Sequence, residues 1–420
     1  MNRIVIVGNG IAGNTAAEVI LRNAKGSHLT LISEEPFPEY SACLLPDYLS
    51  GRLKRERVFL KRLEDYQSKG IESFLGEAAT EIDLRKFEIR TLRRKIPYDK
   101  LILSTGTQSI ISDLPGVGLK GVFPLKTLGD IDRILGWEGQ KAVVLGAGLV
   151  GLKASIALKR RGWDTTLISR RWVLPRVFDE MPAQYLERIL VENGIQVVTG
   201  AEVKGLEGRD RVERVVVNHQ HFQCDMVILA LGLFPNTGLA KDAGIKIGQL
   251  GGIKTDDRMM TNIEEIYGCG DCVEQKDRIS GYNVQSLLWH NAKQQGEIAG
   301  FNASGVKKRY PGVYWIVHLN LLGTSAVAIG LGSDPIRRFG IDKEAMSVID
   351  QEIDGIYERL ILIKDQIVGI QMINSKKYVG MMFSCIQRRD QLSRLIEVLR
   401  NRDLLRVRFW MNWVKPYLPV

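Results

Sequence analysis

One glycine-rich segment limits the possible folds more than any other part of the sequence. It lies near the start of the chain, at residues 8–13, and reads GNGIAG. It follows four β-branched residues, Ile4 to Val7, which are typical of a strand buried on both faces of a sheet. The residues after Gly13 have the pattern of a helix. The order strand, glycine turn, helix is the one that binds a dinucleotide pyrophosphate, because glycine lets the backbone approach phosphate at a helix N-terminus.

An acidic residue follows this turn at the spacing that a ribose contact requires. Glu34 closes the next predicted strand, His28 to Ile32, about twenty residues beyond the turn. A carboxylate at this place can accept a hydrogen bond from a ribose hydroxyl of the dinucleotide. A single glycine fingerprint is weak evidence, but the turn and the acid together predict a dinucleotide site.

The same pattern occurs again about 140 residues later. Residues 141–145 predict a strand, and the sequence GAGLVG at 146–151 leads into another helix. Two such turns imply two βαβ units, each with its own dinucleotide. The strand after the second turn ends in SRR at 169–171 and not in an acid. Arginine suits a 2′-phosphate and favours NADP(H), whereas Gly151 at the third glycine position favours NAD, so the sequence leaves both open.

Two further predicted strands end in small residues. They close on Thr105-Gly106 and on Gly232. Small side chains at a strand end let the backbone come close to a bound cofactor. These positions are therefore expected to border the two dinucleotide sites.

The composition is that of a globular protein without a membrane span. Of 420 residues, 45% are hydrophobic and 25% are charged, which predicts two or three domains, and no apolar run reaches the roughly twenty residues of a spanning helix. The first residues already predict a strand, so no signal segment is expected. Five scattered cysteines argue against a disulfide framework and for the reducing cytoplasm. The net charge of +10 suits an acidic protein, a nucleic acid or a membrane surface, or reflects a general surface bias.

From about Tyr310 the sequence changes to short β-like runs without a glycine fingerprint, followed by a predicted basic helix over 388–402. This pattern predicts an α+β domain. After Cys385 there are eight basic and three acidic residues, and residues 406–417 are rich in arginine and aromatic residues. Such side chains are typical of interface anchors, so this region is a candidate for a partner surface or a dimer interface.

The two fingerprints, together with Thr105-Gly106 and Gly270-Asp271, resemble the pyridine nucleotide-disulfide oxidoreductase superfamily over essentially the whole chain. The resemblance implies an α/β fold with two Rossmann-like dinucleotide-binding domains and a C-terminal α+β interface domain. It implies an FAD-binding domain formed by residues 1–112 and 236–309. An NAD(P)H-binding domain, residues 113–235, is inserted between these two segments. Residues 310–420 would form the interface or partner domain.

The resemblance also implies which residues touch each cofactor. For FAD the matching positions are Gly8, Gly10, Ile11, Ala12, Gly13, Glu34, Glu35, Thr105, Gly106, Gly270 and Asp271. For the nicotinamide cofactor they are Gly146, Gly148, Leu149, Val150, Gly151, Arg170 and Gly232. No metal site is expected.

Two branches of the superfamily share local sequence with this chain. Residues 33–40, SEEPFPEY, look like the branch of rubredoxin and ferredoxin reductases and of the nitrite reductase FAD module, which pass electrons from NAD(P)H through flavin to a protein or metal centre. Cys43 and the residues after it look like the coenzyme A-disulfide reductase and NADH oxidase branch, whose single cysteine lies by the flavin. Leu44 and Asp47 depart from that branch, which usually has Gly and Tyr there.

Two residues are candidates for catalysis. Cys43 is either a thiolate beside the flavin that attacks a disulfide or forms a sulfenic acid, or a small side chain that fills space. Lys153 stands where the family commonly has Glu; it either stabilises an anionic reduced flavin or packs its stem under the nicotinamide site. Cys269 and Cys272 have C-x-x-C spacing, but they flank the Gly-Asp motif on the phosphate side of FAD, which disfavours a redox role.

Three functions follow from this resemblance. The first is an electron-transfer flavoprotein subunit that exchanges electrons between NAD(P)H and a protein carrier or iron–sulfur partner subunit, as a homodimer or in a hetero-oligomeric redox complex. The second is a single-cysteine NAD(P)H oxidase or coenzyme A-disulfide/polysulfide reductase that uses Cys43. The third is a flavin-binding protein whose basic surface binds nucleic acid or a partner; no known nucleic-acid module is present, so nucleic acid is not expected.

Overall fold

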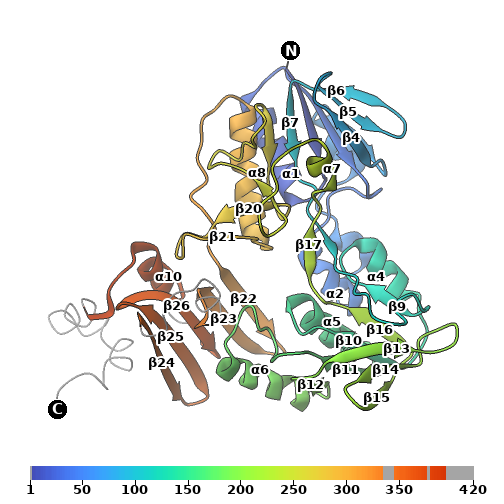
Figure 1. Ribbon diagram of the computed structural model, residues 1–420, viewed down its shortest axis with the longest axis vertical. Helices are drawn as coiled ribbons and strands as arrows, with labels where there is room; N and C mark the ends of the chain where they lie inside the picture. The colour runs from blue at the N-terminus through green and yellow to red at the C-terminus, as the bar shows by residue number, and fades with distance from the viewer. Residues whose placement is uncertain (1, 334–344, 376–378, 394–420) are drawn as a thin grey trace. The chain divides into compact units, whose positions relative to one another are not determined.

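The computed structural model describes residues 2–333, 345–375 and 379–393. The chain forms two compact units (Figure 1). The first contains Met1–Arg170 and Ala201–Val313, and the second contains Arg171–Gly200 and the described residues from Tyr314 onward. The chain thus leaves the first unit twice, at Arg171 and at Tyr314.

A five-stranded parallel sheet lies at the centre of the first half of unit 1. Its strands, in spatial order, are β19 (Ile266–Gly268), β7 (Lys100–Leu103), β1 (Arg3–Val7), β2 (His28–Ser33) and β3 (Ile71–Leu75). From Ile4 onward the residues of β1 are buried, as the run of β-branched residues predicted. The sheet therefore has the buried, central first strand that a dinucleotide fold requires.

Two helices pack closely against each other beside this sheet (Figure 1). They are α1 (Ile11–Asn23) and α8 (Trp289–Ala303). A Cβ atom at Gly296 of α8 would lie 2.2 Å from the Ala12 carbonyl oxygen of α1. The glycine lets α8 touch the first turn of α1, which begins directly after the first two glycines of the fingerprint.

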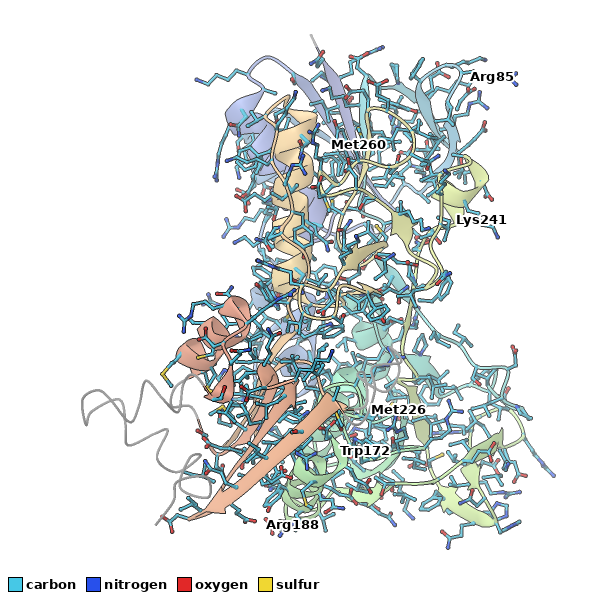
Figure 2. The ribbon with its side chains drawn as sticks, turned by 60° about the vertical axis from the view of Figure 1, so that its left-hand side comes forward. Arg85, Trp172, Arg188, Met226, Lys241 and Met260 are labelled. Atoms are coloured by element: carbon cyan, nitrogen blue, oxygen red, sulfur yellow. The ribbon has the colours of Figure 1, made fainter. Side chains whose placement is uncertain are left out.

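Shorter elements complete this half. An antiparallel meander of β4 (Ala79–Asp83), β5 (Glu88–Thr91) and β6 (Lys95–Pro97) contributes Ile82, Ile89 and Ile96 to the hydrophobic core. The segment between β2 and β3 holds two 3₁₀ turns, η1 and η2, and two short helices, α2 and α3. Their bounds are Ala42–Leu44, Arg55–Val58, Leu45–Leu49 and Leu63–Ser68. The remaining elements are β18 (Ile253–Lys254), β20 (Val273–Lys276), β21 (Asn283–Val284) and α7 (Gly238–Asp242), which carries Lys241 (Figure 2).

A second parallel sheet forms the other half of unit 1. Its neighbouring strands are β11 (Asp164–Ile168), β10 (Lys141–Leu145), β16 (Met226–Leu229) and β9 (Val122–Pro124). It is accompanied by α4 (Leu128–Leu135), α5 (Leu149–Arg160) and the antiparallel strands β13 (Val203–Glu207), β14 (Arg214–Val217) and β15 (Gln220–Gln223). Two strands, β8 (Thr107–Ser109) and β17 (Leu233–Pro235), pair antiparallel where the chain passes between the two halves. The prediction of two Rossmann-like units is confirmed.

Unit 2 is built on an antiparallel sheet. Its order is β22 (Ile316–Leu321), β23 (Thr324–Gly330), β26 (Gln366–Ile373), β25 (Ile356–Ile363) and β24 (Met346–Ile353). It also contains α6 (Glu180–Glu192), β12 (Gln196–Val198) and α10 (Val379–Arg388). The predicted α+β character of the C-terminal part is confirmed. Residues 394–402 of the predicted basic helix, and residues 406–417, lie outside the described ranges.

Residues 171–200 belong to unit 2 although the chain reaches them from the second parallel sheet. Asp179, which is buried, ion-pairs with Arg359 of β25 at 3.2 Å and accepts a hydrogen bond from the Ser333 backbone N–H at 2.9 Å. The Asp179 backbone N–H donates to the Gln371 side chain of β26. The predicted division, which gave these residues to the NAD(P)H domain, stays a prediction.

Within the described ranges, no helix combines the length and the apolar character that crossing a bilayer requires.

Candidate dinucleotide-binding sites

The first glycine turn has the conformation that a pyrophosphate site needs. Gly8 has φ +115°, and a Cβ atom there would lie 2.1 Å from the Ser104 carbonyl oxygen. A Cβ atom at Gly13 would lie 2.2 Å from the Gly8 carbonyl oxygen. Only glycine therefore fits either position, and the turn brings the start of α1 against the end of β1.

The second turn repeats this geometry in the other parallel sheet. Gly146 has φ +104°, and a Cβ atom there would lie 2.3 Å from the Ala230 carbonyl oxygen. A Cβ atom at Gly151 would lie 1.8 Å from the Gly146 carbonyl oxygen. The two turns are thus two copies of one strand–turn–helix arrangement.

The middle glycine of each turn faces open space. A Cβ atom at Gly10 or at Gly148 would meet no heavy atom within 4 Å. Each is itself the N-cap of a helix, of 13 and 12 residues respectively, and as a glycine it has no side chain to cap the first N–H groups. The first backbone N–H groups of a helix have no intrahelical acceptor and carry partial positive charge, so each site fits an anion such as a pyrophosphate.

The residues after the first two glycines form the first turns of the helices. Ile11 and Ala12 begin α1, and Leu149 and Val150 begin α5. Their N–H groups are the ones that a bound phosphate would meet.

The two adjacent acids after β2 have different surroundings. The Glu34 side chain is exposed and makes no hydrogen bond or ion pair with any described residue, so it is free to accept from a ribose hydroxyl. Glu35 is half-buried and accepts a hydrogen bond from the Tyr40 hydroxyl at 2.8 Å. Burial raises the pKa of the Glu35 carboxyl. Glu34 is therefore the better ribose acceptor of the two.

The Gly-Asp motif lies at the end of β19, beside the first turn. The Gly270 backbone N–H donates to the Gln295 side-chain oxygen of α8 at 2.9 Å. Asp271 is half-buried; burial raises the pKa of its carboxyl, and nearby Lys126 opposes that shift. A carboxylate in this position, with no protein hydrogen bond among the described residues, fits an acceptor for a cofactor hydroxyl.

Thr105 and Gly106 lie where the chain leaves the first half. The Thr105 hydroxyl donates to the Asn236 carbonyl oxygen at 2.5 Å, and the Asn236 N–H donates to Gly106 at 2.9 Å. Gly232 accepts from the Ile110 N–H at 3.0 Å. These backbone and hydroxyl hydrogen bonds flank the paired strands β8 and β17. A Cβ atom at Gly106 would meet no heavy atom within 4 Å, so space remains beside this strand end.

Two predicted basic residues lie in the second half. Arg170 is exposed and lies two residues after β11, at the place equivalent to Glu34 after β2. A hydrogen bond from Lys204 and, to a smaller extent, the positive charge of Arg170 lower the pKa of the Glu202 carboxyl. Lys153 is exposed on α5, and its ammonium makes no ion pair with any residue in the described ranges, so it can meet an anionic group.

The five cysteines are all free, and only Cys43 is exposed. It lies in η1, directly before α2. Cys269 and Cys272 are buried in the core, where the Cys272 Sγ contacts the Cys269 carbonyl oxygen at 3.3 Å. Burial raises the pKa of both thiols, and it raises the pKa of Cys224 to about 12 and of Cys385 to about 11. Cys43 is therefore the one thiol exposed to a reagent or substrate.

Several residues that support the first turn were not predicted from the sequence. Asn9, inside the fingerprint, donates to the Phe37 carbonyl oxygen at 3.0 Å. Asn14 donates to the Asn9 carbonyl oxygen at 2.8 Å, and Lys61 donates to the Asn14 side chain at 2.8 Å. Lys61 lies in the basic stretch at residues 52–62, which the sequence leaves open as a solvated face or a docking patch. Asn14, a polar residue on the apolar face of a predicted helix, was the available signal.

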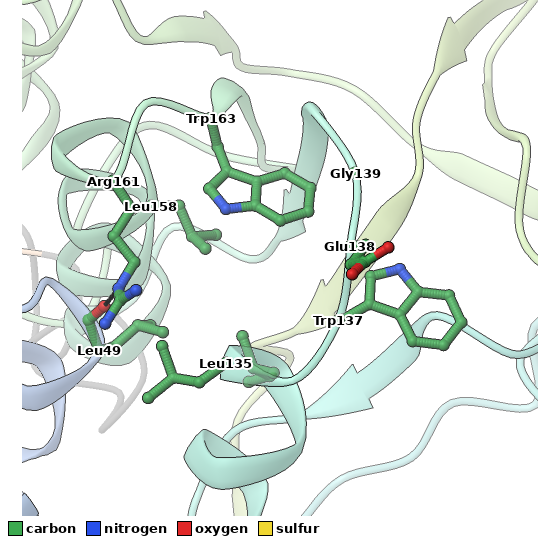
Figure 3. A pocket seen from close by; sticks show the side chains of 9 residues that line it. Leu49, Leu135, Trp137, Glu138, Gly139, Leu158, Arg161 and Trp163 are labelled. Carbon is green, nitrogen blue, oxygen red and sulfur yellow. Dashed lines mark hydrogen bonds between the residues drawn. The ribbon is translucent and has the colours of Figure 1, made fainter.

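A cavity of about 290 Å³ lies at the amino ends of β10 and β11 in the second parallel sheet (Figure 3). Residues 137–139 and 163, which precede β10 and β11, line it, together with Leu49 and Arg161. Figure 3 shows Arg161 and Glu138 on opposite sides of it. The Arg161 guanidinium donates to the Leu49 carbonyl oxygen. Because the glycine turn follows the carboxyl end of β10, this cavity is separate from the nucleotide site.

Together these features define a protein with two dinucleotide sites on parallel sheets, which FAD and a nicotinamide dinucleotide fit. Residues 2–296 match the family described as pyridine nucleotide-disulphide oxidoreductase. The chain belongs to this family, and it is an FAD-dependent NAD(P)H oxidoreductase. In the part of the chain that the structure describes, no cluster of His, Cys, Asp or Glu could hold a metal ion.

Several known proteins are similar to the chain. NADH oxidase of Methanocaldococcus jannaschii is 33% identical over 73% of this chain and 71% of its own. Nitrite reductase [NAD(P)H] of Bacillus subtilis is 30% identical over 93% of this chain, which spans only 48% of that protein. NADH-dependent phenylglyoxylate dehydrogenase subunit epsilon of Aromatoleum evansii is 27% identical over 92% of both. The structure of an NAD-dependent persulfide reductase from A. fulgidus aligns with TM-score 0.89 at 27% identity, over 96% of this chain and 79% of that one.

Proposed function

We propose that the protein is an electron-transfer flavoprotein subunit that exchanges electrons between NAD(P)H and a protein electron carrier or an iron–sulfur partner subunit. Bound FAD would supply the redox chemistry, since it takes up a hydride and releases electrons singly. The protein would bind and orient the two nucleotides. We place the protein in the cytoplasm, within a homodimer or a larger redox complex.

The observation that carries this proposal is the state of the cysteines. Cys43 is exposed, and the other four thiols are buried, with raised pKa values. A thiolate is the nucleophile in disulfide exchange, so buried protonated thiols cannot resolve a disulfide at Cys43. Without an internal dithiol, electrons have to leave the chain to an external acceptor.

The relatives support a protein as that acceptor. The subunit of phenylglyoxylate dehydrogenase matches this chain over nearly the full length of both. The assimilatory nitrate reductase electron transfer subunit of Bacillus subtilis, 27% identical, matches 96% of this chain, which spans 50% of it. The net charge of +10 would attract an acidic carrier.

Each group of site residues has a role in this proposal. The first turn, with Glu34, Asp271 and the small residues at 105–106, would bind FAD in residues 1–112 and 236–309. The second turn would bind NAD(P)H in 113–235, and Gly232 would border it. Arg170 would contact a 2′-phosphate, which favours NADPH over NADH. Lys153 would place a positive charge toward the reduced flavin, and residues 310–420 would form the interface domain.

An anaerobic titration of the flavoprotein with NADH and with NADPH, for wild type and Cys43→Ala, tests the proposal. We expect both proteins to bleach at one two-electron equivalent per FAD. We also expect reduction of an acidic [2Fe–2S] ferredoxin at equal rates by both, with little oxygen uptake. A wild type that takes up extra equivalents, or a ferredoxin rate no faster than that of oxygen, would contradict the proposal.

A second candidate function is reduction of a persulfide, a coenzyme A disulfide or oxygen with Cys43 as the only redox thiol. The exposure of Cys43 at the start of α2 favours it, because such a thiol is open to a substrate. Two proteins similar to this chain carry the names NADH oxidase and NAD-dependent persulfide reductase. This function requires that Cys43→Ala abolish disulfide or persulfide reduction, and that the wild type show a thiolate–flavin absorption band that the variant lacks.

A further inference from the structure

A buried polar network lies beneath the first glycine turn. Its centre is the Lys61 ammonium, whose side chain is 10% exposed. The ammonium lies 3.0 Å from a Glu39 carboxylate oxygen, 3.1 Å from a Glu18 carboxylate oxygen and 2.8 Å from the Asn14 amide oxygen. These three acceptors match the three N–H donors of a lysine, so the ammonium is fully used inside the protein.

The network reaches the turn through two asparagines. The Asn14 amide nitrogen lies 2.8 Å from the Asn9 carbonyl oxygen and 3.2 Å from the Gly10 carbonyl oxygen. The Asn9 side-chain oxygen accepts from the Tyr66 hydroxyl at 2.9 Å. These bonds hold the carbonyl side of the turn and leave its N–H side facing outward.

The same network holds the loop that follows Glu34. The Glu39 backbone N–H donates to the Tyr66 hydroxyl at 2.9 Å, and Asn9 donates to the Phe37 carbonyl oxygen at 3.0 Å. Burial by itself lowers the pKa of Lys61, but its ion pairs with Glu39 and Glu18 outweigh this and raise it, so the ammonium stays charged. The turn and the loop are therefore fixed to one charged group.

We infer that Lys61 is a positioning residue for FAD: through Asn14 it fixes the carbonyl side of the first glycine turn, so that the N–H groups stay aimed at the pyrophosphate. Lys61 touches neither cofactor in this inference. Its effect comes from holding the turn in the binding geometry before the nucleotide arrives, which lowers the ordering cost of binding.

The second turn supplies the natural contrast. The position equivalent to Asn14, six residues after the first glycine, is Leu152, which is fully buried. Asn14→Leu therefore gives the first turn the apolar side chain of the second, with the same number and branching of side-chain heavy atoms. This variant keeps Lys61 with both carboxylates, so it tests the link between Lys61 and the turn.

The experiment measures the FAD dissociation constant of apoprotein by flavin fluorescence, with the apoprotein melting temperature and NADPH binding measured alongside. We expect Lys61→Met and Asn14→Leu each to weaken FAD binding at least tenfold and NADPH binding less than twofold. Lys69→Met is the matched control, because exposed Lys69 contacts the same Glu18 oxygen at 3.9 Å without reaching the turn. We expect it to change FAD binding less than twofold.

A double variant separates positioning from stability. Lys61→Met leaves Glu39 buried without a counter-charge, which lowers the melting temperature; adding Glu39→Gln removes that charge and restores part of the stability. We expect the double variant to regain melting temperature while FAD binding stays at least tenfold weak. Recovery of FAD affinity together with melting temperature would overturn the inference, as would wild-type FAD affinity in Asn14→Leu. If Lys61→Met does not fold, Asn14→Leu and the double variant decide.

Discussion

The two glycine turns share a backbone but differ in what supports it. In both, the first glycine has a φ above +100° and the third glycine packs on the carbonyl oxygen of the first. Three positions in and around the first turn are polar: Asn9, Asn14 and Ser104. Their equivalents in the second turn are apolar: Ala147, Leu152 and Ala230.

This difference suggests how one fold holds two similar nucleotides for different lengths of time. Glycines set the shape of both turns, so both fit a pyrophosphate. A network of buried hydrogen bonds fixes a turn more rigidly than apolar contact does, which suits a resident cofactor. The apolar turn suits a nucleotide that enters and leaves in each cycle. The fingerprint thus suits both turns to the same kind of ligand, whereas the residues beneath it differ in how firmly they hold the turn.

The largest effect is expected when the third glycine of either turn is replaced by valine. Gly13→Val and Gly151→Val would each place a Cβ atom within about 2 Å of a carbonyl oxygen, so the turn cannot close. We expect Gly13→Val to abolish FAD binding and Gly151→Val to weaken NAD(P)H binding more than 100-fold, roughly 2.7 kcal/mol. Visible absorbance measures FAD content, and stopped-flow reduction measures nucleotide binding. Loss of FAD in Gly151→Val would show that the two turns are not independent.

The next test concerns the residue after the second strand of each half. Arg170→Glu places an acid where the first half has Glu34. We expect it to shift the kcat/KM ratio of NADPH to NADH at least tenfold toward NADH, about 1.4 kcal/mol, because the acid repels a 2′-phosphate. Glu34→Gln is the control, since it should leave this ratio unchanged and weaken FAD only. An unaltered ratio in Arg170→Glu would remove Arg170 from the nucleotide site.

A smaller effect on stability and FAD binding is expected at Ser104, whose hydroxyl has no counterpart at Ala230 beside the second turn. The Ser104 hydroxyl lies 3.0 Å from both the Val7 and the Gly8 carbonyl oxygens. Ser104→Ala should lower the free energy of unfolding by about 1 kcal/mol, the net value of one buried hydrogen bond, and weaken FAD binding a few fold. Urea unfolding and FAD titration measure both, and Ala230→Ser is the reciprocal variant. An equal loss of NADPH affinity in Ser104→Ala would contradict a local role.

The smallest expected effect is a loss of folding stability in alkaline solution. It should occur in both halves of unit 1. Burial raises the pKa of Cys224 to about 12, and it also raises that of Cys272 in the first half. Between the unfolded and the folded pKa the native state holds more protons, so stability falls as pH rises. From about pH 8 to about pH 9 we expect a loss of about 0.7 kcal/mol from Cys224 and a loss in the same direction from Cys272. Cys224→Ala and Cys272→Ala should each flatten the pH dependence of urea unfolding slightly; a steeper dependence would contradict this.

The parts of the fold that depend on neighbouring residues could be predicted from the sequence. Buried strands, glycine turns and the following helices are local patterns, so both parallel sheets and the α+β part were predicted. Glu34 and Arg170 were predicted from the strand that follows each turn, and the strand ends at Gly106 and Gly232 from the small residues that close buried strands.

The parts that depend on distant contacts could not be predicted. Lys61 lies 47 residues from Asn14, and no spacing rule links them. The stretch at residues 52–62 was predicted as a solvated face or a docking patch, yet Arg55 pairs with Asp132 at 2.9 Å and the Lys61 side chain is only 10% exposed. The grouping of residues 171–200 with the C-terminal sheet depends on pairs such as Asp179 with Arg359, 180 residues apart.

That grouping has a consequence for how such proteins could exchange parts during evolution. A crossover near Val313 would import a foreign C-terminal sheet but keep the native residues 171–200. Asp179 would then lose Arg359 and Gln371, and a buried carboxylate would be left without its cation. A viable hybrid therefore needs three coordinated crossovers, near residues 170, 200 and 313, so we expect the excursion at 171–200 and the C-terminal region to be inherited together.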